Sequence, residues 1–153
     1  MQKAKLNKKE SERELQKQEG VAEVYCIKAD CKFFGVGGEP QNTSEAIELY
    51  DKSAARNNSK AMMVLGRIYE NGIHVKQNLD KAFQYYRYAW DTNQEPYAMY
   101  KIGMFLEEGN HPEPECVNGK PNREFAYQYF KEALNIGDLD AENAFKEAFF
   151  KIG

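Results

Sequence analysis

Three cysteines and two histidines are the residues of this sequence best suited to bind a metal ion: Cys26, Cys31, Cys116, His74 and His111. Cys26 and Cys31 are five positions apart, whereas residues three or four apart share a helix face. Neither histidine has a cysteine or carboxylate at a spacing typical of a zinc site. Cys116 and His111 could complete such a site with the other two cysteines, but nothing in the spacing favours it. Because free cysteine is commonly a small core residue, we expect buried thiols, no metal and no cofactor.

The sequence carries none of the common catalytic motifs. Gly35, Gly37 and Gly38 form a glycine-rich stretch, but it follows a predicted helix and no Lys-Ser/Thr pair comes after it. A phosphate-binding loop needs backbone N–H groups at a strand-to-helix turn. No G-x-S-x-G, H-E-x-x-H or kinase pattern occurs. Since the carboxylates are scattered over predicted helix faces, the sequence indicates a protein that is not an enzyme.

Two helical patterns alternate along the chain and would position any side chain that contacts a partner. The first, A-x-x-x-[L/I]-G-x-x-[Y/L]-x-x-G, begins at Ala61 and again 37 positions later at Ala98. The second, A-x-x-[L/Y]-[Y/F]-x-x-[A/S], begins at Ala46, Ala82 and Ala126. Its offsets of 0, 3, 4 and 7 define one face of an α-helix. A regular period of this size, built from two alternating helix types, predicts a stacked array of helix pairs.

Together the two patterns resemble the Sel-like repeat, a relative of the tetratricopeptide repeat, over roughly residues 24–153. The resemblance is strongest in the middle repeat, which carries Ala61, Leu65, Gly66, Tyr69, Gly72, Lys81, Ala82, Tyr85, Tyr86 and Ala89. It implies an all-α fold, a right-handed α-α superhelix that forms a short solenoid of antiparallel helix pairs. It also implies the usual role of that family, which is to scaffold other proteins. Trp90 and Leu134 depart from the family, because they stand where it usually has a small residue.

We expect a charged amino-terminal arm, residues 1–20, followed by a repeat domain, residues 21–153. Within that domain we expect repeats at about 21–57, 58–94 and 95–137, and a terminal half-repeat at 138–153. The arm holds six Lys/Arg and four Glu. It favours helix by propensity but has no apolar stripe with which to dock. It is therefore either a frayed, solvated leader or an arm that becomes ordered on a partner.

Local details of the repeats can also be predicted. Residues 21–34 are expected to form a buried helix, in which Asp30 or Cys31 stands where the middle repeat has Gly66. Thr43 or Ser44 is expected to cap the next helix. An insertion of seven residues within 110–124 is expected to be an exposed loop, open to partner contact or to neutral variation.

Composition and charge exclude some classes of partner. The formal net charge of the 153 residues is −3, far from the basic balance of a nucleic-acid-binding protein. No apolar run is long enough for a membrane span, and the amino terminus has no apolar segment of the signal-peptide type. The odd number of cysteines does not suggest a disulfide framework. We expect an intracellular protein, cytoplasmic by default, with an organelle left open.

The candidate partner-binding residues lie on the first helix of each pair, which should line the concave face of such an array. One stripe beside the predicted buried set comprises Met63, Arg67 and Glu70, and their equivalents 37 positions later, Tyr100, Met104 and Glu107. Methionine adapts to a partner's shape, and tyrosine and arginine are common anchors. Packing between neighbouring first helices is the alternative for the same side chains. Phe150, on the last predicted helix, either abuts another chain or folds against a nearby loop.

The function that these features favour is a non-catalytic protein–protein interaction scaffold, an accessory subunit of a larger assembly whose partners are other protein chains. One alternative is a transient peptide-binding adaptor or chaperone-like module. Another is a small hydrolase or ligand-binding domain built on the same scaffold.

Overall fold

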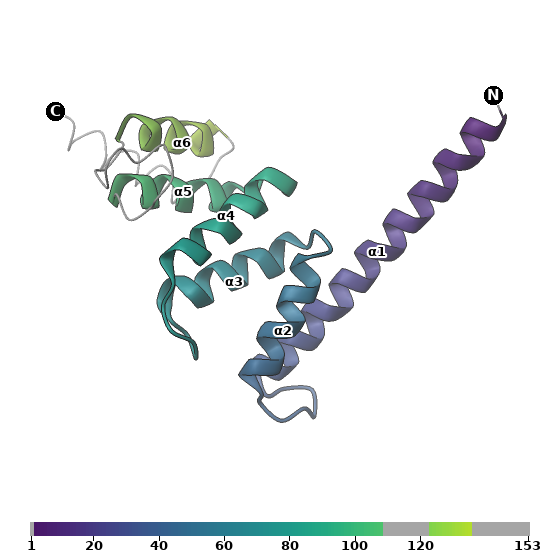
Figure 1. Cartoon of the computed structure of the whole chain (residues 1–153), viewed down its shortest axis with the longest axis horizontal. Coiled ribbons are helices and arrows are strands. Elements are labelled where there is room, and N and C mark those ends of the chain that lie inside the picture. The colour runs from purple at the N-terminus through teal and green to yellow at the C-terminus, as the bar shows by residue number, and fades with distance from the viewer. Residues whose placement is uncertain (1, 109–122, 136–153) are drawn as a thin grey trace. The chain divides into compact units, whose positions relative to one another are not determined.

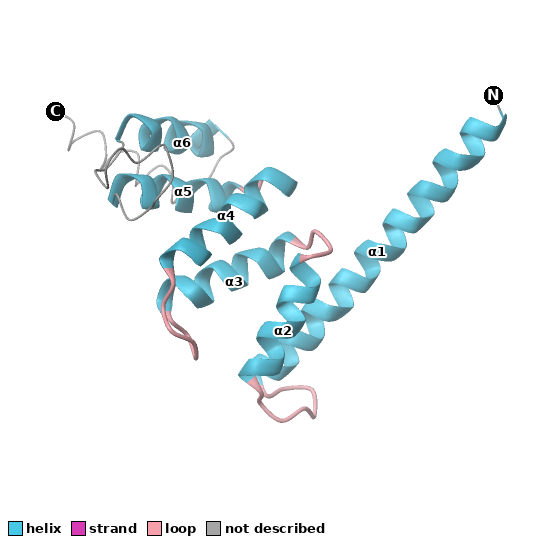
Figure 2. Ribbon diagram, in the orientation of Figure 1, coloured by secondary structure: helices cyan, strands magenta, loops and turns pink. Residues whose placement is uncertain are grey.

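The computed structural model describes residues 2–108 and 123–135, and within these ranges it contains helices and no strand (Figure 2). The helices are α1 (Gln2–Phe34), α2 (Thr43–Ala54), α3 (Ser59–Asn71), α4 (Leu79–Asn93), α5 (Pro96–Glu108) and α6 (Arg123–Asn135) (Figure 1). We call α1, α3 and α5 the first helices of their pairs, and α2, α4 and α6 the second helices. The predicted all-α class is confirmed. The chain divides into two compact units between Met62 and Met63.

In the first unit, α2 packs against the carboxyl-terminal part of α1, and the amino-terminal turns of α1 extend beyond it (Figure 1). The helical propensity predicted for the arm is confirmed, and the helix predicted for residues 21–34 begins at Gln2 instead. On α1, the small residues Ala22, Cys26 and Ala29 are buried. The buried Ser53 hydroxyl of α2 donates a hydrogen bond of 2.6 Å to the carbonyl oxygen of Ala22. Small residues at this crossing allow the two helices to approach closely.

Asparagines, not hydroxyl residues, cap the second helices. The Oδ1 of Asn42 accepts a hydrogen bond of 3.1 Å from the backbone N–H of Glu45 at the start of α2. The Oδ1 of Asn78 accepts one of 2.9 Å from the N–H of Lys81 at the start of α4. Each bond satisfies a backbone donor that the helix itself leaves without a partner. The predicted caps Thr43 and Ser44 are therefore wrong, because both lie inside α2.

The first helices α1 and α3 end in the same way, which fixes how their repeats align. Gly35 and Gly72 follow them directly, both with a φ of 65° in the left-handed region that favours glycine. The residue after each glycine donates its backbone N–H to the fifth residue before it: Val36 to Cys31 at 3.1 Å and Ile73 to Ile68 at 3.0 Å. In each repeat a glutamine side chain then donates to a carbonyl near the helix end: Gln41 to Phe33 at 3.0 Å and Gln77 to Glu70 at 2.8 Å.

This shared ending places Ala29 of α1 at the position of Gly66 of α3. The expectation of Asp30 or Cys31 there is wrong. The loop of the first repeat, from Gly35 to its asparagine cap, is one residue longer than the loop of the second repeat. An alignment that matches α2 with α4 therefore shifts α1 by one residue relative to α3.

In the second unit, an aromatic ring of a second helix covers a glycine of the first helix in each pair. A Cβ added to Gly66 would lie 2.6 Å from the ring of Tyr86, and one added to Gly103 would lie 2.6 Å from the ring of Phe130. Both rings are fully buried. The glycines are thus needed so that the helices can pack closely, which is the physical reason for the G in the first pattern and the aromatic residue in the second.

Candidate partner-binding surfaces

The carboxylate of Glu70 joins three helices of the second unit. The hydroxyl of Tyr86 on α4 donates to its Oε2 at 2.6 Å, and the Nζ of Lys101 on α5 donates to its Oε1 at 2.8 Å. Burial and the hydrogen bond to Glu70 raise the pKa of Tyr86 far above its usual range. Burial lowers the pKa of Lys101, but the hydrogen bond and the charge of Glu70 outweigh it and raise this pKa on balance. The tyrosine therefore stays protonated and the lysine charged, and the two hydrogen bonds join α3 to α4 and to α5.

The first unit contains a cluster of the same kind. The hydroxyl of Tyr50 on α2 donates to the Oδ1 of Asp30 at 2.6 Å, and the Nζ of Lys60 on α3 donates to the Oδ2 of Asp30 at 2.8 Å. Burial, with the bond to Asp30 second, raises the pKa of Tyr50 well above its usual range. In both units, a carboxylate of one first helix thus binds a tyrosine of its own second helix and a lysine of the next first helix. We call these two clusters the tyrosine–carboxylate–lysine staples.

The six predicted residues of the stripe all lie on α3 and α5 in the second unit. Arg67 is exposed, and Met63, Glu70, Tyr100, Met104 and Glu107 are half-buried. Both oxygens of Glu70 are engaged in the staple, and the ring of Tyr100 lies 6.2 Å from that of Phe130 and packs on the core formed by Met99 and Ala133. Part of the stripe therefore holds the repeats together, as the packing alternative expected, and its role in binding stays a prediction. Phe150, the insertion within 110–124 and the half-repeat at 138–153 lie outside the described residues.

The other predicted chemical groups show no sign of a metal centre within the described parts of the chain. Cys26 is buried and Cys31 is half-buried, both as free thiols, and Cys116 and His111 lie outside those parts. Burial, followed by the nearby charge of Asp30, raises the pKa of the Cys26 thiol, which keeps it protonated. Over residues 2–108 and 123–135, no group of three or more His, Cys, Asp or Glu side chains is arranged to hold a metal ion.

A surface that the sequence analysis missed lies on the outer face of α1. Counting from Gly35 and Gly72, the positions of Ala61, Leu65 and Ile68 on α3 correspond to Val24, Lys28 and Cys31 on α1. The three residues of α3 are buried, whereas Val24 is 50% exposed, Lys28 is exposed and Cys31 is half-buried. The signal that could have found this surface was the alignment on the two glycines, which shows a lysine where the repeat has a core leucine.

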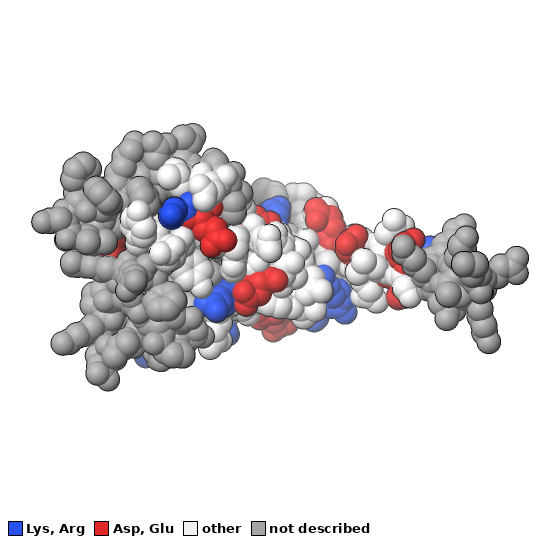
Figure 3. Space-filling view, turned by 90° about the horizontal axis from the view of Figure 1, so that it is seen from above, with Lys and Arg blue, Asp and Glu red and all other residues white. Residues whose placement is uncertain are grey.

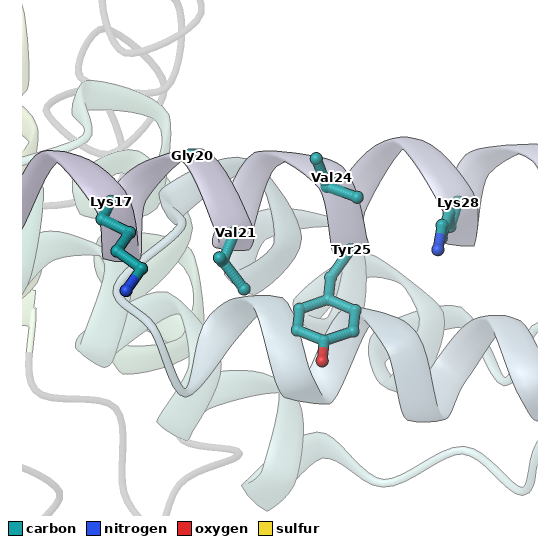
Figure 4. A pocket seen from close by; sticks show the side chains of 6 residues that line it. All are labelled: Lys17, Gly20, Val21, Val24, Tyr25 and Lys28. Carbon is teal, nitrogen blue, oxygen red and sulfur yellow. The ribbon is translucent and has the colours of Figure 1, made fainter.

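Two hollows lie along this outer face, and the residues that line them belong to the first unit. One, of about 330 Å³, is formed by α1 alone and is shown in Figure 4. The other, of about 450 Å³, shares Lys28 with the first and continues past Ile27 and Cys31 to Leu49 of α2. Several apolar side chains of α1 are exposed on or beside this face: Val21, Val24, Ile27 and Phe34. On the face of the molecule drawn in Figure 3, acidic and basic side chains are interspersed and do not form one large patch of a single sign.

Comparison with known proteins identifies the repeat. The Sel1 repeat matches this chain three times, at residues 29–58, 59–89 and 96–138. The chain belongs to the Sel1 repeat family. Sel1 repeats are in general protein–protein interaction modules, and their fold is typically a non-enzymatic scaffold.

Solved structures agree with this assignment. The chain is 30% identical to a Sel1 repeat protein from Oxalobacter formigenes, with a TM-score of 0.72, and the match covers 85% of this chain and 50% of that one. It is 26% identical to a protective antigen of uropathogenic Escherichia coli strains that displays an SLR fold, with a TM-score of 0.67, over 84% of this chain and 26% of the antigen. Helicobacter pylori cysteine rich protein B shares the fold at 24% identity and a TM-score of 0.58, over 86% and 94% of the two chains. No curated protein matches the sequence.

The chain spans half of the Oxalobacter protein and about a quarter of the antigen. The first Sel1 match begins at residue 29, in the carboxyl-terminal third of α1. Residues 2–28 of the same helix lie outside the repeat pattern, and they include every residue that lines the hollow formed by α1. Throughout the described ranges, no helix combines the length and the apolar character that crossing a bilayer requires.

Proposed function

We propose that this Sel1 repeat chain is a non-catalytic interaction scaffold that serves as an accessory subunit of a larger protein assembly. The observation that carries this proposal is the outer face of α1, where positions that are buried in the later first helices are exposed. Exposed apolar side chains gathered on one face are typical of protein interaction sites. The staples support the non-catalytic part, because they engage Glu70 and Asp30 in helix packing.

Purification of the epitope-tagged full chain from its native cell, under mild conditions, tests this function. Size-exclusion chromatography with light scattering should find the chain in a species much heavier than one copy, with another protein at a fixed ratio. A chain that elutes as a monomer at every step, with no partner at a constant ratio, would contradict the proposal.

A transient peptide-binding adaptor is the second candidate, and the half-buried stripe on α3 and α5 favours it. Met63 and Met104 are adaptable apolar side chains, and the exposed Arg67 lies on the same stripe. Weak, rapidly reversible peptide binding that Tyr100→Ala abolishes would distinguish an adaptor from a permanent subunit. A small hydrolase has less support, because Glu70 already binds a tyrosine and a lysine. A broad activity screen with a Glu70→Gln/Glu107→Gln control would test it.

A further inference from the structure

Gly20 is a glycine for which the packing of the described chain gives no reason. Of the glycines that the structure describes, three lie inside helices, and two of these, Gly66 and Gly103, are each covered by an aromatic ring. A Cβ added to Gly20 would meet nothing within 4 Å. Glycine inside a helix is less stable than alanine, because it has more backbone freedom to lose. In the second unit, by contrast, helical glycines mark the places where a ring from another helix packs closely.

The surroundings of Gly20 form a notch that could receive such a ring. Lys17, Val21, Val24 and Lys28 follow one another at intervals of four, three and four residues, which places them on one face of α1. Gly20 lies beside this row, between Lys17 and Val21, and Tyr25 borders the row (Figure 4). Val21 is 38% exposed and Val24 is 50% exposed, so the floor of the notch is apolar and faces solvent.

The charges around the notch indicate what kind of partner it fits. Of its six lining residues, two are lysines and none is a carboxylate. Lys17 and Lys28 are eleven residues apart, which corresponds to about 16 Å along a helix. The guanidinium of Arg56, which follows the end of α2, lies 5.0 Å from the centre of the Tyr25 ring and adds a third positive charge at the border. The ion pair of the nearby Glu39 is formed with Lys32, at 2.8 Å, while Lys28 acts on Glu39 only through its charge. A partner with apolar residues between two acidic ends would therefore complement the row.

A second copy of this chain does not complement it. In a parallel pair of α1 helices, Lys17 and Lys28 would each face themselves. In an antiparallel pair that matches Val21 with Val24, Lys17 of one copy would face Lys28 of the other. Like charges placed directly opposite each other are unfavourable, so both arrangements are disfavoured and the occupant is a different protein.

We infer that the notch is the docking site for an amphipathic helix of a partner protein, which seats a bulky apolar or aromatic side chain over Gly20 and pairs its carboxylates with Lys17 and Lys28. This inference rests on the proposed function and names the partner's chemistry. It also gives a role to the turns of α1 that precede the first repeat, because these turns carry Lys17 and Gly20.

A displayed library of amphipathic helices of about five turns, randomised along one face, is a direct probe. Selection on the full chain should enrich helices with Asp or Glu at both ends and a large apolar residue nearer to the end that faces Lys17. Gly20→Leu fills the notch and should weaken these binders by at least about tenfold, without lowering the thermal stability of the free chain. Gln16→Leu is the matched control, because it adds the same side chain to an exposed position of the same helix outside the notch and should change nothing.

The double variant Lys17→Glu/Lys28→Glu supplies a second, independent readout. It should reverse the selection, so that helices with Lys or Arg at the two ends are enriched. The inference is overturned if no helix is enriched or if Gly20→Leu leaves binding unchanged. It is also overturned if the double variant still selects helices with acidic ends. Self-association that Gly20→Leu abolishes would also overturn it in favour of a second copy. Binders lost in Arg67→Glu but not in Gly20→Leu would reject this notch while leaving the proposed scaffold function in place.

Discussion

The first helices α1 and α5 hold equivalent places in their repeats, but the same face is exposed in one and buried in the other. On α5, this face carries Ala98, Ile102 and Phe105, all buried, and the ring of Phe105 lies 5.9 Å from Phe83 and 6.1 Å from Tyr86 of the preceding second helix α4. On α1, the equivalent face carries Val24, Lys28 and Cys31, and within the described residues no preceding second helix covers it. The difference shows what a first helix gains from a preceding second helix, and which surface of α1 the described residues leave uncovered.

The largest expected effect is on the free energy of unfolding, when one buried side chain and one exposed side chain are each shortened to alanine. Tyr86→Ala removes a fully buried ring from above Gly66 and should lower the free energy of unfolding by about 3–5 kcal/mol. Val24→Ala, on the exposed face of α1, should change it by less than about 0.5 kcal/mol. Urea unfolding followed by circular dichroism measures both. Similar losses for the two variants would show that the α1 face is buried in the free chain.

The second effect compares two glycines. Gly66→Ala places a methyl group 2.6 Å from the Tyr86 ring, and the resulting overpacking should cost about 1–3 kcal/mol of unfolding free energy. The matched change Gly103→Ala, beneath Phe130, should cost a similar amount. Denaturant midpoints of the two variants test this, and a neutral Gly66→Ala would mean that the ring does not lie over this glycine.

The third effect concerns pH and the staple at Glu70. The pKa of Tyr86 and that of Lys101 are both raised in the folded state. The stability that they contribute is therefore fully present below their ordinary values near 10 and is lost as the pH rises through the folded-state values. Above about pH 10, Tyr86→Phe should show a shallower loss of stability than the wild type, by up to about 1.4 kcal/mol per pH unit. Equal slopes in alkaline urea titrations would show that the Tyr86 hydroxyl has no raised pKa.

The smallest expected effect is an increase in stability, whereas the changes above all decrease it. Gly20→Ala adds a methyl group to open space inside a helix and should raise the helical stability of α1 by about 0.5–1 kcal/mol. Thermal unfolding followed at 222 nm should show a slightly higher or unchanged midpoint. A lowered midpoint would mean that Gly20 is packed in the free chain, which would remove the contrast with Gly66.

The sequence predicted the helix types and their order well, because these depend on local spacing. The small and aromatic positions of the two patterns, such as Gly66 with Tyr86, were found from offsets within single helices. The capping residue was missed because Asn42, Thr43 and Ser44 are all good caps, and only the backbone decides which one stands at the end of the helix.

What the sequence could not provide depends on long-range contacts. Glu70 binds Tyr86 and Lys101, which are 16 and 31 positions away, and no local pattern marks either bond. This is why Glu70 was predicted for a partner while the structure uses both of its oxygens internally. The exposed face of α1 was missed for a related reason, since residues 21–34 are apolar enough to be buried and no local pattern shows whether another helix covers Val24.

The most direct test of the scaffold account is to compare Gly20→Leu with Gln16→Leu in the native cell. Each tagged full chain would be purified under mild conditions, and the ratio of partner to chain would be measured by quantitative mass spectrometry. The account predicts that Gly20→Leu loses the partner, while Gln16→Leu retains it and both chains remain folded. Recovery of the same partner at the same ratio with both variants would contradict the account.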